Sequence, residues 1–151
     1  MSFTGLFMLM SVSAFLIMPT IVSATCSAPY CPPPWRAFGA HCYQWIDKKM
    51  SWIDAERYCQ MLSHPGKMVH LASIANEEKH IIGQYAEDRG QAVWIGLFNN
   101  SGQNFQWVDG SPADSLCWQK AQPSYDGDCV EWFQAMNDRP CETEQTFVCK
   151  F

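Results

Sequence analysis

The side chains best suited to chemistry in this chain are concentrated near its C-terminal end. Residues 122–138 are rich in carboxylate and amide groups. Calcium in proteins takes about six to eight oxygen ligands from carboxylates, amides and carbonyls. The stretch is therefore a candidate cation site. The net charge of −5 is compatible with cation binding and argues against nucleic acid, whose phosphates need a basic surface.

Catalytic patterns are absent from the sequence. The chain has no Gly-x-Ser-x-Gly, no His-Glu-x-x-His and no phosphate-binding glycine loop. Three histidines are interpreted as surface or helix-edge residues rather than as general bases: His64, His70 and His80. Asp126 and Asp128 have the residue types of a glycosidase pair, but neither lies on an expected rigid element. We predict that the chain is not an enzyme.

The N-terminal residues have the pattern of a secretory signal. Residues 1–24 contain no charged side chain, residues 5–22 are mostly apolar, and Val22-Ser23-Ala24 supplies small residues for cleavage. The pattern predicts a signal peptide over 1–24, with an uncleaved membrane anchor as the alternative. Residues 25–151 contain no second long apolar run. We expect one secreted, extracellular domain over 25–151 that does not span a membrane.

Cysteines indicate the redox environment of this domain. All eight follow residue 24, and an even number in a small secreted chain predicts a disulfide framework. Spacing alone does not choose among the pairings. Structural zinc is the competing interpretation, but no Cys-x-x-Cys occurs and the histidines offer no ligand pair at helical spacing.

Two segments have helical signals. Ser51 is the expected N-cap of a first helix that runs to about Leu62, before His64-Pro65-Gly66. A second helix is expected to begin between Ser73 and Asn76 and to end at Gly90. Its expected buried stripe consists of Ile81, Ile82 and Tyr85.

The remaining chain has strand patterns and one long irregular segment. A strand pair is expected around Cys42, followed later by strands over 93–97, 105–108, 129–133 and 147–149. Residues 109–128 carry turn formers, acids and amides with almost no strand pattern. A loop of that length in a compact domain is usually functional or disordered. Trp52, Trp94 and Trp107 lie in core-like patterns, so we assign them to packing.

An ordered series of motifs resembles the C-type lectin-like domain family. The motifs span about residues 31–151, which is nearly all of the expected mature chain. They are Cys31-Pro32-x-x-Trp35, the helix over 52–59, Leu71-Ala72-Ser73 with Glu77-Glu78, Trp94-Ile95-Gly96-Leu97, Phe105-x-Trp107-x-Asp109-Gly110, Trp118-x-x-x-Gln122-Pro123, Cys129-Val130-Glu131, Asn137-Asp138 and Cys149.

The resemblance implies a mixed α+β fold. Two helices would flank a small antiparallel sheet, and a long loop would leave and re-enter the core. The resemblance also implies three disulfides, Cys31–Cys42, Cys59–Cys149 and Cys129–Cys141. Cys26 and Cys117 fall outside that framework. We predict a disulfide-linked homodimer through one of them, with an internal Cys26–Cys117 bridge as the alternative.

Sugar-binding members of the family hold one principal calcium beside a cis-proline. Mapped onto this sequence, the proline is Pro123. The implied Ca²⁺ ligands are Gln122, Ser124, Asp126, Asn137 and Asp138. The implied sugar contacts are Gln122, Ser124, Tyr125, Asn137 and Asp138. Asp114 with Asp128 is a candidate second calcium site.

Three positions depart from the family pattern. Ser124 stands where the family usually has Asn or Asp, and Met136 replaces the Trp that commonly precedes the Asn-Asp pair. Gly127 occupies the position, two residues before Cys129, where the family usually has an acid. Asp126 or Asp128 must then supply that carboxylate, and we favour Asp126.

The resemblance implies calcium-dependent binding of glycans on cell or microbial surfaces by a secreted recognition or innate-immune lectin. Gln122 before the proline favours galactose-type sugars, with loose selectivity because Ser124 is neither acid nor amide. The alternative is a calcium-independent module that binds a protein or another non-sugar ligand. Trp118 is interpreted as structural, and Asn99 begins an N-glycosylation sequon.

Overall fold

The structure, a computed structural model, describes residues 29–102 and 104–151. The expected signal peptide and Cys26 lie outside the described residues. The strands are β1 (Arg36–Phe38), β2 (His41–Met50), β3 (His70–Leu71), β4 (Val93–Asn99), β5 (Phe105–Trp107), β6 (Cys129–Phe133), β7 (Ala135–Arg139) and β8 (Gln145–Lys150). The helices are α1 (Trp52–Met61) and α2 (Lys79–Arg89), with a 3-10 turn, η1 (Asn76–Glu78), directly before α2.

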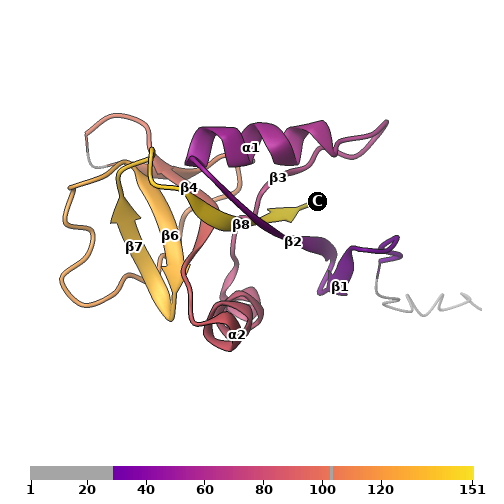
Figure 1. Cartoon of the computed structure of the whole chain (residues 1–151), viewed down its shortest axis with the longest axis horizontal. Coiled ribbons are helices and arrows are strands. Elements are labelled where there is room, and N and C mark those ends of the chain that lie inside the picture. The colour runs from indigo at the N-terminus through magenta and orange to yellow at the C-terminus, as the bar shows by residue number, and fades with distance from the viewer. Residues whose placement is uncertain (1–28, 103) are drawn as a thin grey trace, which may run out of the picture.

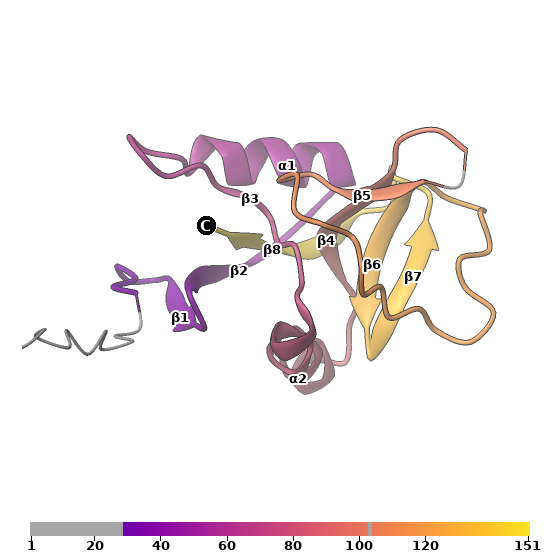
Figure 2. The same cartoon turned by 180° about the vertical axis from the view of Figure 1, so that it is seen from behind.

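The two α-helices lie on opposite sides of one sheet (Figures 1 and 2). Its strand order is β1-β2-β8-β4-β6-β7, with β3 beside β8 and β5 beside β4. The antiparallel pairing implied by the resemblance holds for every described pair of strands except β4 with β8, which is parallel. The fold class is therefore α+β, as predicted, with a mixed sheet.

Helix α1 begins and ends where its sequence signals predict. The Ser51 hydroxyl accepts a hydrogen bond from the Asp54 N–H at 3.3 Å, so it satisfies one of the free donors of the first turn. Leu62 is the C-cap. Trp52, Ala55 and Cys59 are buried on one face, as their helical spacing predicts.

Helix α2 also ends as predicted, at Gly90, whose φ of 62° is a left-handed conformation that glycine adopts without steric cost. The expected buried stripe is only partly correct. Ile82 is buried, but Ile81 and Tyr85 are half-buried. The helix instead turns Gly83 and Ala86 inward with Ile82, because it packs against β6.

The core consists of two groups of buried side chains, one beside each helix. Trp52 and Trp94 belong to the group beside α1, and Trp107 belongs to the group beside α2. All three are at most 6% exposed, which confirms that they are packing residues. The Trp52 indole donates to the Ile95 carbonyl at 2.8 Å, so its buried polar atom is satisfied.

Three disulfides link distant parts of the chain. They are Cys31–Cys42, Cys59–Cys149 and Cys129–Cys141, the pairs that the resemblance implies. The second ties α1 to β8, across 90 residues of sequence. The third ties the start of β6 to the segment that follows β7. Closing loops in this way lowers the entropy of the unfolded chain, and each bridge typically contributes about 2 to 4 kcal/mol.

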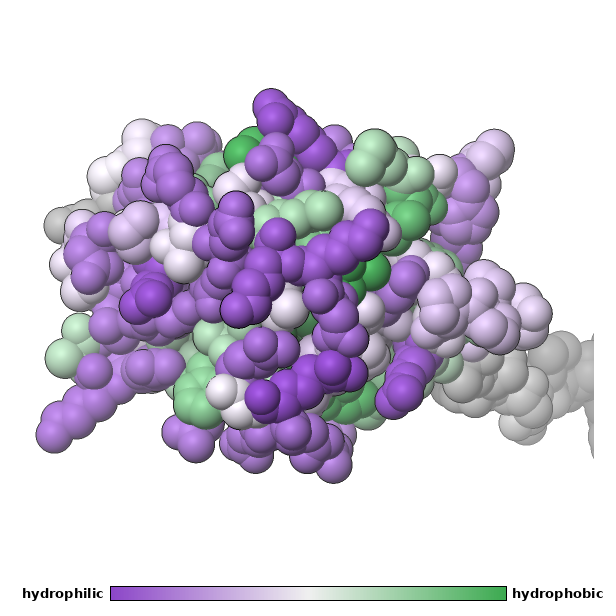
Figure 3. Space-filling view, viewed as in Figure 1, coloured by the Kyte–Doolittle hydropathy of each residue, from purple (hydrophilic) through white to green (hydrophobic). Residues whose placement is uncertain are grey.

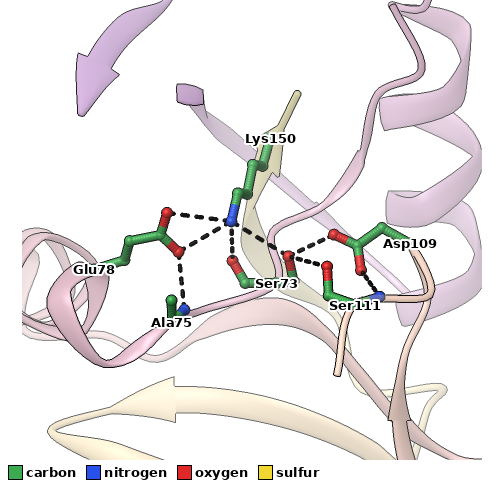
Figure 4. Close-up of polar contacts among 6 residues, drawn as sticks. All are labelled: Ser73, Ala75, Glu78, Asp109, Ser111 and Lys150. Carbon is green, nitrogen blue, oxygen red and sulfur yellow. Dashed lines mark hydrogen bonds and ion pairs between the residues drawn. The ribbon is translucent and has the colours of Figure 1, made fainter. Parts of the chain in front are cut away.

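A buried polar cluster ties β8 to α2 and to the start of the long loop (Figure 4). Lys150 Nζ lies 3.0 Å from Glu78 Oε2 and donates to the Ser73 carbonyl, also at 3.0 Å. The Ser73 hydroxyl donates in turn to Asp109. Lys150, Glu78 and Ser73 are each at most 8% exposed. The hydrogen-bond partners of Lys150 and Glu78 among the described residues are all polar, so neither buried charge is left unpaired.

This cluster shifts the pKa of Glu78 and of the neighbouring Tyr43. Burial by itself would raise the pKa of Glu78, but the Tyr43 hydroxyl nearby, the Ala75 N–H and Lys150 together lower it below the ordinary value. Burial raises the pKa of Tyr43 well above its ordinary range, and Glu78 adds to the effect. The Tyr43 hydroxyl lies close to Glu78 but has no hydrogen-bond partner within 3.5 Å among the described residues.

The surface of the molecule is mainly hydrophilic on the face drawn in Figure 3, where hydrophobic side chains form small separate patches. Within the described ranges, no helix combines the length and the apolar character needed to cross a membrane.

Candidate functional site

The long loop between β5 and β6 forms one wall of the candidate site. As predicted, residues 109–128 contain no strand, only an isolated bridge between Trp118 and Met136. The Met136 N–H donates to the Cys117 carbonyl at 2.7 Å, and the Gln119 N–H donates to the Met136 carbonyl at 2.9 Å. These bonds attach the middle of the loop to β7 (Figure 2). Residues 122–124 are thereby brought toward the Asn137-Asp138 pair.

Ser124 joins the loop to β7 at the centre of the site. The Gln122–Pro123 peptide is cis, as the resemblance implies. The Ser124 N–H donates to Gln122 Oε1 at 2.7 Å and to Asp138 Oδ1 at 2.8 Å. The Ser124 hydroxyl lies 3.4 Å from the same Asp138 oxygen. Ser124 therefore links two other predicted calcium ligands, Gln122 and Asp138.

Asp138 is the buried acid of this group. Its side chain belongs to a residue that is only 1% exposed. Oδ1 is hydrogen-bonded, whereas Oδ2 is buried and has no hydrogen-bond partner among the described residues. A buried carboxylate oxygen without a donor is costly, and the cost falls if a cation binds it. The donor set and the unsatisfied oxygen fit a calcium ion.

Asn137 lies on the other face of β7, as the alternation along a strand requires. In the β6–β7 pairing, Asn137 is opposite Glu131 and Asp138 is opposite Val130. Asn137 Nδ2 donates to Glu131 Oε1 at 2.8 Å, and Gln145 Nε2 donates to Glu131 Oε2 at 2.6 Å. Sequence reasoning did not assign a role to Glu131, which holds the Asn137 amide in one orientation.

The acid that the family usually supplies before Cys129 has no room in this chain. A Cβ added to Gly127 would lie 1.9 Å from the Arg139 carbonyl carbon and 2.4 Å from the Pro140 nitrogen. Asp128 is engaged elsewhere, because its Oδ1 accepts a hydrogen bond from Asn99 Nδ2 at 2.9 Å. Asp126 is exposed and makes no hydrogen bond with another described residue, so its carboxylate is uncommitted.

Carboxylates are therefore scarce at the site. Within residues 29–102 and 104–151, no three His, Cys, Asp or Glu side chains gather where they could hold a metal ion together. A calcium ion here would depend on amide, hydroxyl and carbonyl oxygens in addition to Asp138. Asp114 is exposed, and nothing in the described residues brings it to Asp128 as a second site.

Comparison with known proteins assigns the family. The sequence profile described as "Lectin C-type domain" matches residues 48–151. The chain belongs to the C-type lectin family. Over 133 residues it is 36% identical to the C-type lectin LmsL of Lachesis stenophrys, covering 80% of this chain and 96% of LmsL.

Solved structures agree with this assignment. The C-type carbohydrate-recognition domain of cow CD23, crystallised in the presence of a GlcNAc2Man3 oligosaccharide, superposes with a TM-score of 0.72 at 30% identity, covering 81% of this chain and 95% of that one. Herring type II antifreeze protein gives a TM-score of 0.72 at 24% identity, covering 80% of this chain and 98% of that one, and shares the fold alone.

A C-type lectin is a binding protein rather than an enzyme, as predicted, and the three histidines have local packing partners. His70 Nδ1 lies 2.7 Å from Glu56 Oε1, a contact that makes His70 more buried than the expected surface residue. The ring of His64 meets that of Phe151 with centroids 5.8 Å apart, and the ring of His80 meets that of Phe38 at 5.0 Å.

Two aromatic side chains of the long loop between β5 and β6 differ in role. Trp118 packs edge-on against Phe105, with ring centroids 4.8 Å apart, and contacts the buried group beside α2. The prediction that Trp118 is structural is therefore confirmed. Tyr125 is 49% exposed and directly follows Ser124. Its ring is therefore accessible from solvent next to Ser124.

Proposed function

We propose that this C-type lectin binds saccharides through a calcium ion held between the long loop and β7. The observation that carries the proposal is the buried, unpartnered Oδ2 of Asp138 beside Gln122 and Ser124. The ligands would be Gln122, Ser124, Asp126 and Asp138, and Asn137 would have to turn from Glu131 toward the ion to join them. When bound, calcium supplies a positive charge that can take two sugar hydroxyls as further oxygen ligands.

The protein's own side chains orient the sugar. Gln122 Oε1 and the Ser124 hydroxyl flank the proline, and both can accept hydrogen bonds from sugar hydroxyls. The exposed ring of Tyr125 offers an apolar surface for the C–H face of a pyranose. An amide before the proline favours galactose-type hydroxyl geometry. Because Ser124 can both donate and accept, we expect loose selectivity.

A calcium-independent function is the second candidate. It is favoured by the close packing of Gly127 on Arg139, which removes the carboxylate that the family usually places there. The domain would then bind a protein or another non-sugar ligand through the same loop. The choice between the two candidate functions depends on whether Asp126 supplies the missing carboxylate, because it is the uncommitted acid next to Gly127 in the sequence.

The wider biological proposal follows from the sequence. We infer that residues 1–24 direct secretion and that residues 25–151 act outside the cell. The partners would be glycans on cell or microbial surfaces, and a disulfide-linked homodimer would raise avidity by joining two weak sites. Asn99 is a glycosylation candidate, although both ends of its side chain are hydrogen-bonded, to Asp128 and to the Asn104 N–H.

A glycan array tests the proposed function. Full-length secreted protein is applied in millimolar calcium and, separately, in excess chelator. The proposal expects binding to galactose-containing glycans that chelator abolishes. No binding of galactose-containing glycans in calcium would favour the alternative, a module for a protein or another non-sugar ligand. Release of a labelled sugar during incubation would contradict the assignment as a binding protein.

A further inference from the structure

A second hollow lies far from the proposed calcium site, between the β1–β2 hairpin and α2. Its volume is about 300 Å³, at the lower end of the range for small-molecule sites. Figure 1 shows β1 and the long loop at opposite ends of the molecule. A smaller hollow of about 150 Å³ adjoins the first, since both are lined by Arg36, Trp45 and Tyr85.

Aromatic rings form the walls of the larger hollow. Phe38, Tyr43, Trp45 and Tyr85 all line it. The rings of Trp45 and Tyr85 are stacked, with centroids 4.8 Å apart. The cluster of aromatic side chains gives the hollow an apolar lining, which suits a ligand that has an apolar face.

Tyr85 is held in place by Asp47 and Arg89. Its hydroxyl donates to Asp47 Oδ1 at 2.9 Å, and Arg89 lies over the ring with Cζ 4.3 Å from the centroid. Arg89 also donates to both Asp47 oxygens, at 2.9 and 3.1 Å. The aromatic wall is thus formed before any ligand arrives, which lowers the entropic cost of binding.

Polar groups at this hollow lack partners among the residues that the structure describes. The indole N–H of Trp45 is buried and has no acceptor among the described residues. At the rim, Arg36, Gln84 and Asp88 are exposed, and their side chains make no hydrogen bond or ion pair with another described residue. Guanidinium, amide and carboxylate groups are planar and can each engage two neighbouring hydroxyls.

We propose that this hollow is a second, calcium-independent saccharide site, which takes one or two neutral pyranose units. A sugar combines an apolar C–H face, matched by the aromatic wall, with vicinal hydroxyls, matched by the rim. Arg36 and Asp88 carry opposite charges, so the rim favours a neutral ligand over an ion. The adjoining smaller hollow lengthens the groove toward Asp47 and Arg89, as a second sugar unit requires. The proposal does not depend on the calcium site.

Nuclear magnetic resonance of the full chain in excess chelator tests the proposal, with cellobiose as the probe. The Trp45 indole signal, identified by its loss in Trp45→Phe, is expected to shift and saturate with a millimolar Kd. Asp88→Asn and Gln84→Ala, both on the exposed side of α2, should weaken binding about threefold to tenfold through loss of a hydrogen bond. Glu87→Gln on the same helix and Asp138→Asn at the calcium site should leave the titration unchanged.

Four results would overturn the proposal. The first is no shift at about 50 mM cellobiose, far above a millimolar Kd, and the second is a shift that requires calcium. The third is full binding by both rim variants. The fourth is equally tight saturation by benzyl alcohol, which would mean that the hollow binds aromatic compounds in general. The calcium-dependent array result is independent of all four, so failure here leaves the proposed function standing.

Discussion

The Ser124 N–H donates a hydrogen bond of 2.8 Å to Asp138 Oδ1, although 14 positions separate the two residues. This bond fixes the part of the long loop that carries Gln122 and Ser124 against β7. It also occupies one oxygen of Asp138 and leaves the other buried without a partner. The proposed calcium site is therefore organised without a bound ion, and Asp138 is its least satisfied group.

Gly127 is expected to tolerate no side chain. A Cβ there would overlap the Arg139–Pro140 backbone at 1.9 to 2.4 Å, and backbone cannot move aside cheaply. Gly127→Ala should lower the free energy of unfolding by about 1 to 3 kcal/mol, as overpacking typically does. Gly127→Glu should destabilise the domain as well and fail to tighten calcium. Urea unfolding and calcium titration measure both effects.

Gly83→Ala is the matched control for that prediction. An added Cβ at Gly83 would lie 3.5 Å from Trp132 Nε1, an ordinary contact, and the residue is inside α2. Alanine should be neutral there or should stabilise by up to about 1 kcal/mol, because glycine is a poor helix former. Equal losses at Gly83 and Gly127 would mean that the close contact at Gly127 is not the cause.

The Lys150–Glu78 pair should contribute to stability only as a pair. Lys150→Met leaves a buried carboxylate without its cation and should cost about 3 to 5 kcal/mol. The double variant Lys150→Met with Glu78→Met should recover a large part of that loss, because neither charge remains. A double variant less stable than Lys150→Met would contradict a direct coupling between the two residues.

The same pair predicts the acid sensitivity of the domain. The pKa of Glu78 is lower in the folded chain than its ordinary value of 4.5, so the unfolded chain binds the proton more readily. The contribution of Glu78 to stability is therefore full above pH 4.5 and is lost as the pH falls through the lower folded value. Unfolding measured against pH should show a smaller acid loss in Glu78→Gln than in the wild type.

Gln122 and Ser124 are the predicted selectivity residues. Ser124→Asp adds the missing negative charge beside Asp138 and should tighten calcium and sharpen galactose preference. Gln122→Glu with Ser124→Asn places an acid before Pro123 and an amide after it. This double variant should move preference toward mannose. Competition by free galactose and free mannose measures each variant. A wild type that prefers mannose, or an unchanged ratio in both variants, would contradict the assignment.

Cys117 is predicted to take part in a covalent bond with Cys26 or with a second chain. It is half-buried beside β7 and has no disulfide partner among the described residues. We expect a dimer on a non-reducing gel that reducing agent converts to monomer. Cys117→Ser and Cys26→Ser identify the linking residue. A monomer in every lane would exclude the dimer, and peptide mapping would then test the internal bridge.

Local signals in the sequence were sufficient for the helices and for most strands. Ser51 and Gly90 mark helix ends through their own side chain and backbone, so no tertiary information is needed. β7 was not predicted, because Ala135-Met136-Asn137-Asp138-Arg139 lacks a clear alternation of apolar and polar residues. It lies at the end of the strand order, where no described strand pairs with its outer side, and backbone hydrogen bonds of Met136 with Cys117 and Gln119 stabilise that side.

Contacts between distant residues explain what the sequence could not reveal about the site. The proximity of Gln122, Ser124 and Asp138 was implied by the family resemblance, whereas the bond between Asn137 and Glu131 depends on the β6–β7 register. The pairing of Lys150 with Glu78 spans 72 positions and has no local signal. The steric limit at Gly127 is visible only once Arg139 is placed beside it.

Calcium-dependent thermal unfolding of wild type and Asp138→Asn tests the central claim most directly. With a Kd on the order of 10⁻⁴ to 10⁻³ M, about 5 mM calcium should stabilise the wild type by about 1 to 2 kcal/mol over chelator. Asp138→Asn should lose that gain, while its stability in chelator stays within about 1 kcal/mol of wild type. Asp88→Asn on α2 is the control, and calcium should stabilise it as much as it stabilises the wild type. No calcium response in the wild type, or a full response in Asp138→Asn, would contradict a calcium site built on Asp138.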